Sequence, residues 1–288
     1  MLIETHAHLD YPDFAADFGD VLRRAIEAGV TRIITIGTSI ESSRRAIELS
    51  EQHSNIFAVI GVHPSYAEQA EEDVITPLRE LAQHPRVVAI GETGLDYHEL
   101  PSKRVEKEKQ VQVFARALQT ETDEEIEAEI HDGAYKSRQA SLFEQQLDLA
   151  VELGLNVVIH QRDAWDDTLE ILAPYENKLR GVFHCFGGSL EQAHDVIGRG
   201  HLVSFTGIVT FKNGKAVREV AAEVPLNKFM VETDCPYLAP VPFRGKRCEP
   251  AHTRLVAEEI AKARALDVDF VAHATTATAE GFFLFDRE

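Results

Sequence analysis

The stretch MLIETHAHLD (residues 1–10) is the first of a series of similar segments, and this series decides the fold. A short apolar run ends in His6 and His8. Residues i and i+2 of a strand point to the same side, so both imidazoles can reach one ion if this run is a strand. A single histidine is more often a hydrogen-bonded structural residue, so the pair gains meaning only from what the rest of the chain places beside it.

Runs of β-branched and apolar residues recur along the whole chain. They lie at 2–6, 31–37, 56–62, 86–92, 155–160, 181–186, 201–205 and 228–234. Segments with apolar residues at helical spacing separate them, at 20–30, 41–52, 140–154, 189–200 and 249–266. Eight strands alternating with helices predict parallel βαβ units, and eight is the number that closes a TIM (β/α)8 barrel. A doubly wound sheet is the alternative, although no GxGxxG follows the first run. We therefore expect a single α/β domain over 1–288.

One segment interrupts this alternation. Residues 99–135 separate the fourth strand from the helix at 140–154. Its middle part, VEKEKQVQVFARAL, has helical spacing, and ETDEEIEAEIHD is strongly acidic and fits either a second helix or a solvated loop. A structureless connection of this length is unusual inside a compact domain. We expect a mainly helical, acidic insertion on the barrel top.

The composition limits the function classes. The 29 basic and 48 acidic residues give a net charge of −19, which opposes non-specific binding to a nucleic-acid backbone. An anionic substrate must then be held by metal ions or by local basic residues. The three cysteines have no CxxC spacing, and no run of about 18 apolar residues occurs. With no signal-like N-terminus, we expect a cytoplasmic protein that does not associate with membranes.

The polar residues that end the predicted strands point to the chemistry. In a parallel barrel, the C-terminal strand ends converge on one mouth, where catalysis takes place. The residues at these ends are His6, His8, Glu92, His160, His184 and Asp234. Four imidazoles and two carboxylates suit two divalent cations, with Glu92 as the bridging ligand. Such ions activate water, and Asp234 can orient that water or take its proton.

Several longer motifs together resemble the TatD family of metal-dependent hydrolases. They are THAHLD (5–10), GVHP (61–64), GETGLDY (91–97), VVIHQRDA (157–164), GVFHCFGG (181–188), SFTGIVTFKN (204–213), ETDCPYLAPVPFRGKRCEPAH (232–252) and ATTATAEGFFLF (274–285). The resemblance covers the chain except about 99–135. It implies a TIM barrel of the amidohydrolase superfamily, and the six strand-end residues match the family's metal ligands. His63 and Arg162 match positions near a phosphate. Glu4 stands where the family usually has Asp.

Other basic and aromatic residues are candidates for substrate contacts. Arg244, Lys246 and Arg247 follow the eighth strand and either form a basic patch at the mouth or hold their loop by salt bridges. We expect Arg244 to bind substrate. Phe186, Phe211 and Phe243 could stack on bases, although aromatic residues at such positions more often belong to the core.

The leading functional expectation is a divalent-metal-dependent deoxyribonuclease, a 3′-to-5′ exonuclease on single-stranded DNA, as the family resemblance implies. Two ions (Mg, Mn or Zn) would serve it, with Glu92 and Asp234 as catalytic residues. DNA would be a transient partner, and a monomer is preferred. An acyl hydrolase such as an aminoacyl-tRNA deacylase is the alternative. A non-catalytic scaffold whose insertion binds another protein is the third hypothesis.

Overall fold

The computed structural model describes residues 1–98, 100–103 and 123–285 and shows a TIM barrel, as predicted. Eight parallel strands pair in sequence order. They are β1 (Leu2–Ala7), β2 (Val30–Ile36), β3 (Ile56–Ile60), β4 (Val87–Asp96), β5 (Val157–Arg162), β6 (Gly181–Phe183), β7 (Leu202–Phe205) and β8 (Phe229–Val231). Because parallel strands are joined by crossover helices, all their C-terminal ends lie at one mouth.

The barrel closes between its first and last strands through main-chain contacts next to the predicted ligands. A parallel bridge joins Ala7 to Cys235. The His8 N–H donates to the Cys235 carbonyl at 2.9 Å, and the Asp234 N–H donates to the His6 carbonyl at 2.9 Å. Strand β8 ends at Val231, before the predicted limit of 234, so Asp234 lies in the loop that completes this closure.

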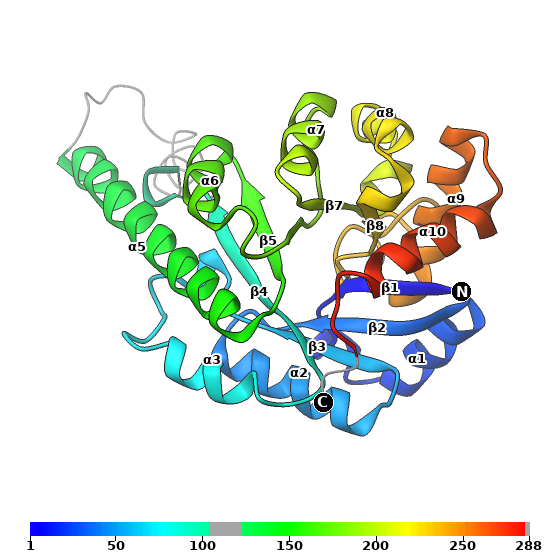
Figure 1. Cartoon of the computed structure of the whole chain (residues 1–288), viewed down its shortest axis with the longest axis horizontal. Helices are drawn as coiled ribbons and strands as arrows, with labels where there is room; N and C mark the ends of the chain where they lie inside the picture. Colours follow the sequence, from blue (N-terminus) through cyan, green and yellow to red (C-terminus); the bar gives the residue numbers. More distant parts are fainter. Residues whose placement is uncertain (99, 104–122, 286–288) are drawn as a thin grey trace, which may run out of the picture.

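Helices surround the sheet (Figure 1). They are α1 (Phe18–Glu27), α2 (Ile40–Gln52), α3 (Ile75–Leu81), α5 (Asp123–Leu153), α6 (Trp165–Leu172), α7 (Leu190–Gly198), α8 (Lys215–Glu223), α9 (Thr253–Arg264) and α10 (Val268–Glu280). Short 3-10 turns include η1 (Pro12–Phe14), η2 (Pro64–Tyr66), η4 (Gly207–Thr210) and η6 (Pro250–His252). Among the helices of the described residues, none is long and apolar enough to cross a membrane.

The core divides into two clusters of buried apolar side chains. The larger cluster lies between sheet and helices and includes Phe14, Phe143 and Leu147. The smaller fills the barrel interior, where Phe282 and Phe283 from the segment after α10 pack against inward-facing strand residues. Burying such side chains contributes about 1.5–3 kcal/mol each. The end of the barrel opposite the mouth is thus closed by apolar side chains.

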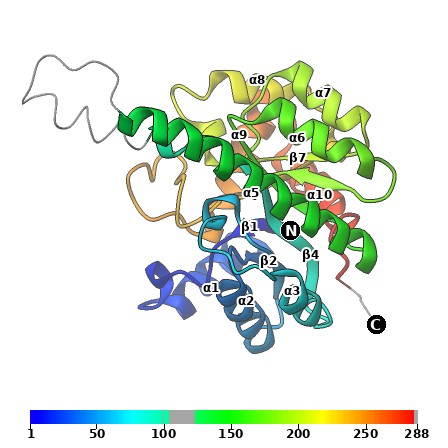
Figure 2. The same cartoon turned by 90° about the vertical axis from the view of Figure 1, so that its left-hand side faces the viewer.

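Helix α5 differs from the sequence expectation. The acidic end of the segment 99–135 and the predicted helix at 140–154 form one continuous helix of 31 residues. Figures 1 and 2 show its N-terminal part projecting beyond the neighbouring helices. Residues 104–122, which contain the whole of VEKEKQVQVFARAL, lie outside the described residues, so the predicted structure of that part stays a prediction.

Two buried glutamines, seven residues apart on one face of α5, fasten this helix to the strands below the mouth. The Gln146 side chain accepts from the Val62 N–H at 2.8 Å and contacts Thr93 Oγ1 at 2.7 Å. The Gln139 side chain accepts from the Asp96 N–H at 2.9 Å and donates to the Asp96 carbonyl at 3.0 Å. An unpaired buried amide is costly, so these contacts fix the helix against β3 and β4.

A close approach between β4 and β5 requires glycine at position 94. Gly94 has φ of +143°, and a Cβ there would collide with the carbonyl oxygen of His160. We expect Gly94→Ala to destabilise the protein by at least about 2 kcal/mol, because it adds backbone strain to this collision. Gly133→Ala in α5, where a Cβ meets nothing within 4 Å, is the control and should be neutral or stabilising by up to about 1 kcal/mol. Urea unfolding measures both. Equal stabilities of the two variants would contradict the packing argument.

Arg247 lies in an ion-pair network that ties the loop after β8 to the start of α1. Its guanidinium contacts Asp17 at 2.7 Å and Glu249 at 2.9 Å, and Arg24 contacts the same two carboxylates at 3.0 and 2.7 Å. Hydrogen bonds from Arg247 and Arg24 hold the pKa of Asp17 well below its usual range. The salt-bridge interpretation of Arg247 therefore fits its position.

A depressed carboxyl pKa contributes stability above the unfolded pKa, near 4, and this contribution is lost as the pH falls through the folded value. We therefore expect Arg247→Gln to lower the thermal midpoint at pH 7 and the difference from wild type to shrink below about pH 4. Arg23→Gln is the control, because Arg23 pairs with two exposed carboxylates on α1. A pH-independent difference between Arg247→Gln and wild type would refute the linkage.

Candidate metal centre

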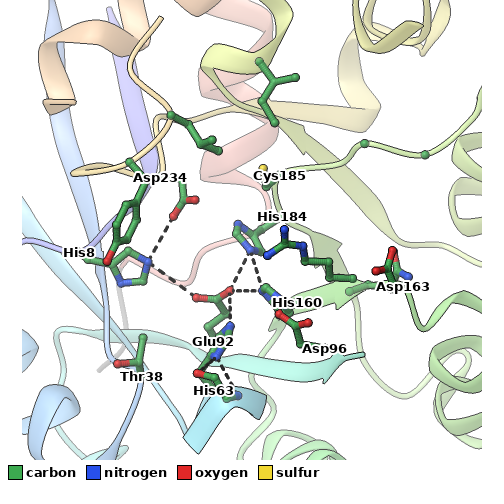
Figure 3. Close-up of a pocket in the computed structure, with 18 of the residues that line it drawn as sticks. His8, Thr38, His63, Glu92, Asp96, His160, Asp163, His184, Cys185 and Asp234 are labelled. Atoms are coloured by element: carbon green, nitrogen blue, oxygen red, sulfur yellow. Dashed lines mark hydrogen bonds and ion pairs between the residues drawn. The ribbon is translucent and has the colours of Figure 1, made fainter. Parts of the chain in front are cut away.

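The other predicted ligands converge around the buried carboxylate of Glu92. Figure 3 shows His8, His160, His184 and Asp234 around it. Glu92 Oε2 lies 3.3 Å from His6 Nε2 and 3.8 Å from His8 Nε2. Glu92 Oε1 lies 2.7 Å from His160 Nδ1 and 2.8 Å from His184 Nε2. The two oxygens of one carboxylate therefore face two different pairs of imidazoles.

Three groups of possible ligand atoms occur among the described residues. One is His6, His184 and Glu232, and the other two meet at the Glu92 carboxylate. The first cluster is His6, His8 and Asp234, whose Oδ1 lies 3.3 Å from His8 Nε2 and 3.7 Å from His6 Nε2. The second cluster comprises His63, Glu92 and His160. In each cluster the ligand atoms lie within 4.8 Å of one another. Each cluster is close enough for its members to share one ion.

Two buried groups of the site, the Glu92 carboxylate and the His6 imidazole, suit a bound cation. Burial opposes the charge of Glu92, but the neighbouring imidazoles, His184 foremost, hold its pKa well below the usual range. Burial lowers the pKa of His6, whose two ring nitrogens are buried without a hydrogen-bond partner among the described residues. A neutral, unpartnered imidazole beside carboxylates is costly in a protein interior, and a bound cation would remove that cost. The donor set therefore suits divalent metal ions.

Three of the imidazoles are backed by an oxygen acceptor that determines which nitrogen carries the proton. His8 Nδ1 lies 3.3 Å from the Ile36 carbonyl, and His160 Nε2 lies 3.1 Å from Asp96 Oδ2. His184 Nδ1 lies 3.6 Å from Glu232 Oε1, just beyond hydrogen-bond distance, and has no hydrogen-bond partner among the described residues. We assign the proton to the nitrogen that faces the acceptor, which leaves the other nitrogen with a lone pair directed at Glu92 or Asp234. In this tautomer, each of the three rings would present its other nitrogen to a metal ion.

His63 has the opposite arrangement. Its Nδ1 accepts from the Ser65 N–H at 3.1 Å, so the proton belongs on Nε2. That Nε2 lies 3.4 Å from Glu92 Oε1. Burial lowers the pKa of His63, which favours the neutral ring. Although His63 is within reach of an ion at the second cluster, its protonated nitrogen faces the site as a hydrogen-bond donor.

Sequence reasoning missed the two carboxylates that back the histidines, Asp96 and Glu232. Asp96 accepts from the His98 N–H at 2.8 Å, and Glu232 accepts from the Cys185 N–H at 2.7 Å. The sequence did contain a signal for both carboxylates, namely an even spacing from a predicted ligand. Asp96 lies four residues after Glu92, and Glu232 lies two residues before Asp234, so each pair points to the same side of an extended segment.

The predicted substrate residues occupy different places. Arg162 lines the cavity of about 1130 Å³ above the clusters, as does His63. Arg244 stacks its guanidinium on the Phe211 ring at 3.7 Å and lies outside the residues that line this cavity. Its role in substrate binding stays a prediction.

Two of the three phenylalanines proposed for base stacking are buried, with Phe186 at 6% and Phe211 at 8% exposure. The third, Phe243, stacks on His252 with the ring centroids 4.5 Å apart. The reading of these rings as packing residues therefore fits the structure better than base stacking.

The comparison with known proteins agrees with this geometry. The family model of TatD-related DNases matches residues 3–134 and 130–284. The chain is 37% identical to an uncharacterized metal-dependent hydrolase, YabD, of Bacillus subtilis, with 98% of this chain and 99% of the relative covered. It is 32% identical to the 3′-5′ ssDNA/RNA exonuclease TatD of Enterobacter lignolyticus, with 95% of each chain covered.

Among solved structures, the TatD homologue YJJV of Escherichia coli superimposes with a TM-score of 0.81 at 27% sequence identity. The match covers 98% of this chain and 97% of that one. The barrel, the buried histidine and carboxylate clusters and the family match over nearly the whole chain lead to one assignment. The chain belongs to the TatD family of metal-dependent hydrolases.

Proposed function

We propose that the protein is a divalent-metal-dependent nuclease that removes nucleotides from the 3′ end of single-stranded DNA. The observation that carries this proposal is the placement of Glu92, whose two oxygens face two separate groups of ligand atoms. Sites that share one carboxylate between two ions are typical of phosphodiester hydrolysis. The 32% identical relative named as a 3′-5′ ssDNA/RNA exonuclease supports the same substrate class.

Two ions, Mg, Mn or Zn, would be held by different residues. His6, His8 and Asp234 would bind the first with Glu92 Oε2, and His160 and His184 would bind the second with Glu92 Oε1. Bound divalent ions lower the pKa of a coordinated water and stabilise negative charge on a phosphate oxygen. Asp96 and Glu232 would keep the His160 and His184 rings in the required orientation and tautomer.

Asp234 is the residue best placed to take a proton from the attacking water. Burial raises its pKa, but the hydrogen bond with His8 and the nearby imidazoles lower it below the usual range overall. The carboxylate is therefore anionic at neutral pH and can accept a proton. Asp234 has a φ of 61°, a left-handed conformation. Its N–H donates to the His6 carbonyl, and its carbonyl accepts from the Tyr237 N–H.

His63 and Arg162 would hold the phosphate. The Nε2–H of His63 faces Glu92 Oε1 and could donate to a phosphate oxygen bound beside it. Arg162, at the end of β5, lines the same cavity with an exposed side chain. Two donors on one side of the clusters would orient a phosphodiester for attack from the side of Asp234.

The proposed substrate is tested by a panel assay. Metal-stripped protein, with each divalent ion restored in turn, should release mononucleotides from single-stranded DNA and lose this activity in chelator. The same protein is assayed on RNA and on simple carboxylic esters. If the loaded enzyme hydrolyses esters but releases no nucleotides, the nuclease assignment is wrong and the acyl-hydrolase alternative takes its place.

Removing the shared carboxylate should affect both ions. We expect Glu92→Ala to reduce the bound metal at both clusters and to lower kcat by more than about 100-fold. Asp234→Asn should weaken the first ion and lower kcat similarly, because an amide cannot take the proton. Metal content by elemental analysis and DNA hydrolysis measure the two effects. A folded Glu92→Ala protein that retains two equivalents of metal would show that Glu92 is no bridge.

The tautomer assignment separates His63 from the ligands. We expect His63→Ala to keep its full metal content and to lower kcat/KM by about 10- to 100-fold, since it loses one hydrogen bond to a charged group. His160→Ala is the matched comparison and should lose one equivalent of metal. Loss of metal from His63→Ala would mean that His63 is a ligand instead of a donor.

A further inference from the structure

Three tyrosines follow site residues at the same spacing, on three different loops. Tyr11 comes three residues after His8, Tyr66 three after His63, and Tyr237 three after Asp234. In each case the tyrosine N–H donates to the carbonyl of the site residue, at 3.3, 2.9 and 3.0 Å respectively. The same tight turn therefore places a tyrosine above a functional residue after β1, β3 and β8.

These three residues, named here the tyrosine rim, lie on one side of the mouth. All three line the cavity above the clusters. The Tyr11 ring stacks on His8 with the centroids 5.0 Å apart, and Tyr237 approaches the edge of Tyr11 at 6.3 Å. Strands β8, β1 and β2 are neighbours in the closed barrel, and Thr38 after β2 lines the cavity between Tyr11 and the loop of Tyr66. The rim is thus continuous along this wall.

Two of the three tyrosines of the rim are exposed, and Tyr11 is partly buried. Tyr66 is 37% and Tyr237 is 55% exposed. Large exposed aromatic side chains that border a cavity are a common feature of binding sites, because one end of a tyrosine is apolar and the other can form hydrogen bonds. Arg162 lines the same cavity on β5. A ligand in this cavity therefore meets the tyrosine rings on one side, and on the other Arg162 together with Trp165, Asp163 and Asp166.

We infer that the tyrosine rim binds a nucleobase of the strand whose phosphate lies at the clusters. This inference rests on the proposed function and adds to it which side of the mouth receives the base. A base is planar and uncharged, so it can stack on tyrosine without loss of charge solvation, and stacking of this kind tolerates any base. The phosphate of the same nucleotide would then face Glu92, His63 and Arg162. Tyrosines would thus take the stacking role that the sequence left open for Phe186, Phe211 and Phe243.

The experiment compares two substrates that differ only in the base. One is a single-stranded oligonucleotide, and the other carries abasic residues at its last two 3′ positions. We expect Tyr237→Leu and Tyr66→Leu each to lower kcat/KM about 10-fold on the first substrate and to leave the second unchanged. Both side chains are exposed, so folding should be retained. Phe270→Leu on α10 is the matched control, because Phe270 is also 55% exposed and does not line the cavity.

Two results would overturn the inference. Either the tyrosine variants lower kcat/KM equally on both substrates, or they change neither substrate. A binding measurement separates this inference from the nuclease assignment. Calorimetry of metal-loaded protein should show tighter binding of deoxyadenosine monophosphate than of deoxyribose 5-phosphate, and Tyr237→Leu should abolish the difference. If that difference is present without any DNA cleavage, the rim binds bases and the proposed reaction is wrong. If DNA is cleaved while the difference is absent, the reaction stands and the rim has no such role.

Discussion

The site depends on how the barrel closes. Strands β1 and β8 meet through main-chain hydrogen bonds in which His6 and His8 face Asp234 and Cys235. The residues that make the closing hydrogen bonds also carry the ligand side chains. The register that closes the barrel therefore also sets the positions of the first cluster. A shift of one residue in this register would turn His6 and His8 away from Asp234.

Glu4 reinforces this closure from inside the barrel wall. Its buried carboxyl accepts from the His6 N–H at 2.9 Å and the Thr233 N–H at 3.0 Å, and the Thr253 hydroxyl donates to it. Burial raises the pKa of Glu4 to about 8. One side chain thereby connects β1, the segment after β8 and the start of α9. This explains how a glutamate serves at a position where the family resemblance implies aspartate.

The sequence was sufficient to predict the barrel and the six converging residues, because alternation along strands and the shared mouth are local and topological properties. It was insufficient where partners come from distant segments. The role of Asp96 depends on His160, which is 64 residues away on the next strand. The donor role of His63 depends on a local turn in which the Ser65 N–H reaches its ring, and periodicity does not encode this turn either. The burial of Phe186 and Phe211 and the exposure of Tyr237 follow from how loops pack, which periodicity does not encode. The continuity of α5 was missed because acidic composition is compatible with both a helix and a loop.

The overall charge of −19 places a constraint on how the proposed substrate would bind. A polyanion gains little from a surface with this excess of carboxylates. Binding of a long stretch of nucleic acid along the protein surface is therefore unfavourable. Favourable contacts are concentrated at the mouth, where buried carboxylates can hold cations and where Arg162 and the tyrosine rim line one cavity. Recognition confined to a single cavity suits the end of a strand better than its interior. The acidic surface and the concentrated site are therefore consistent with each other, and together they favour an exonuclease over an enzyme that binds along a strand.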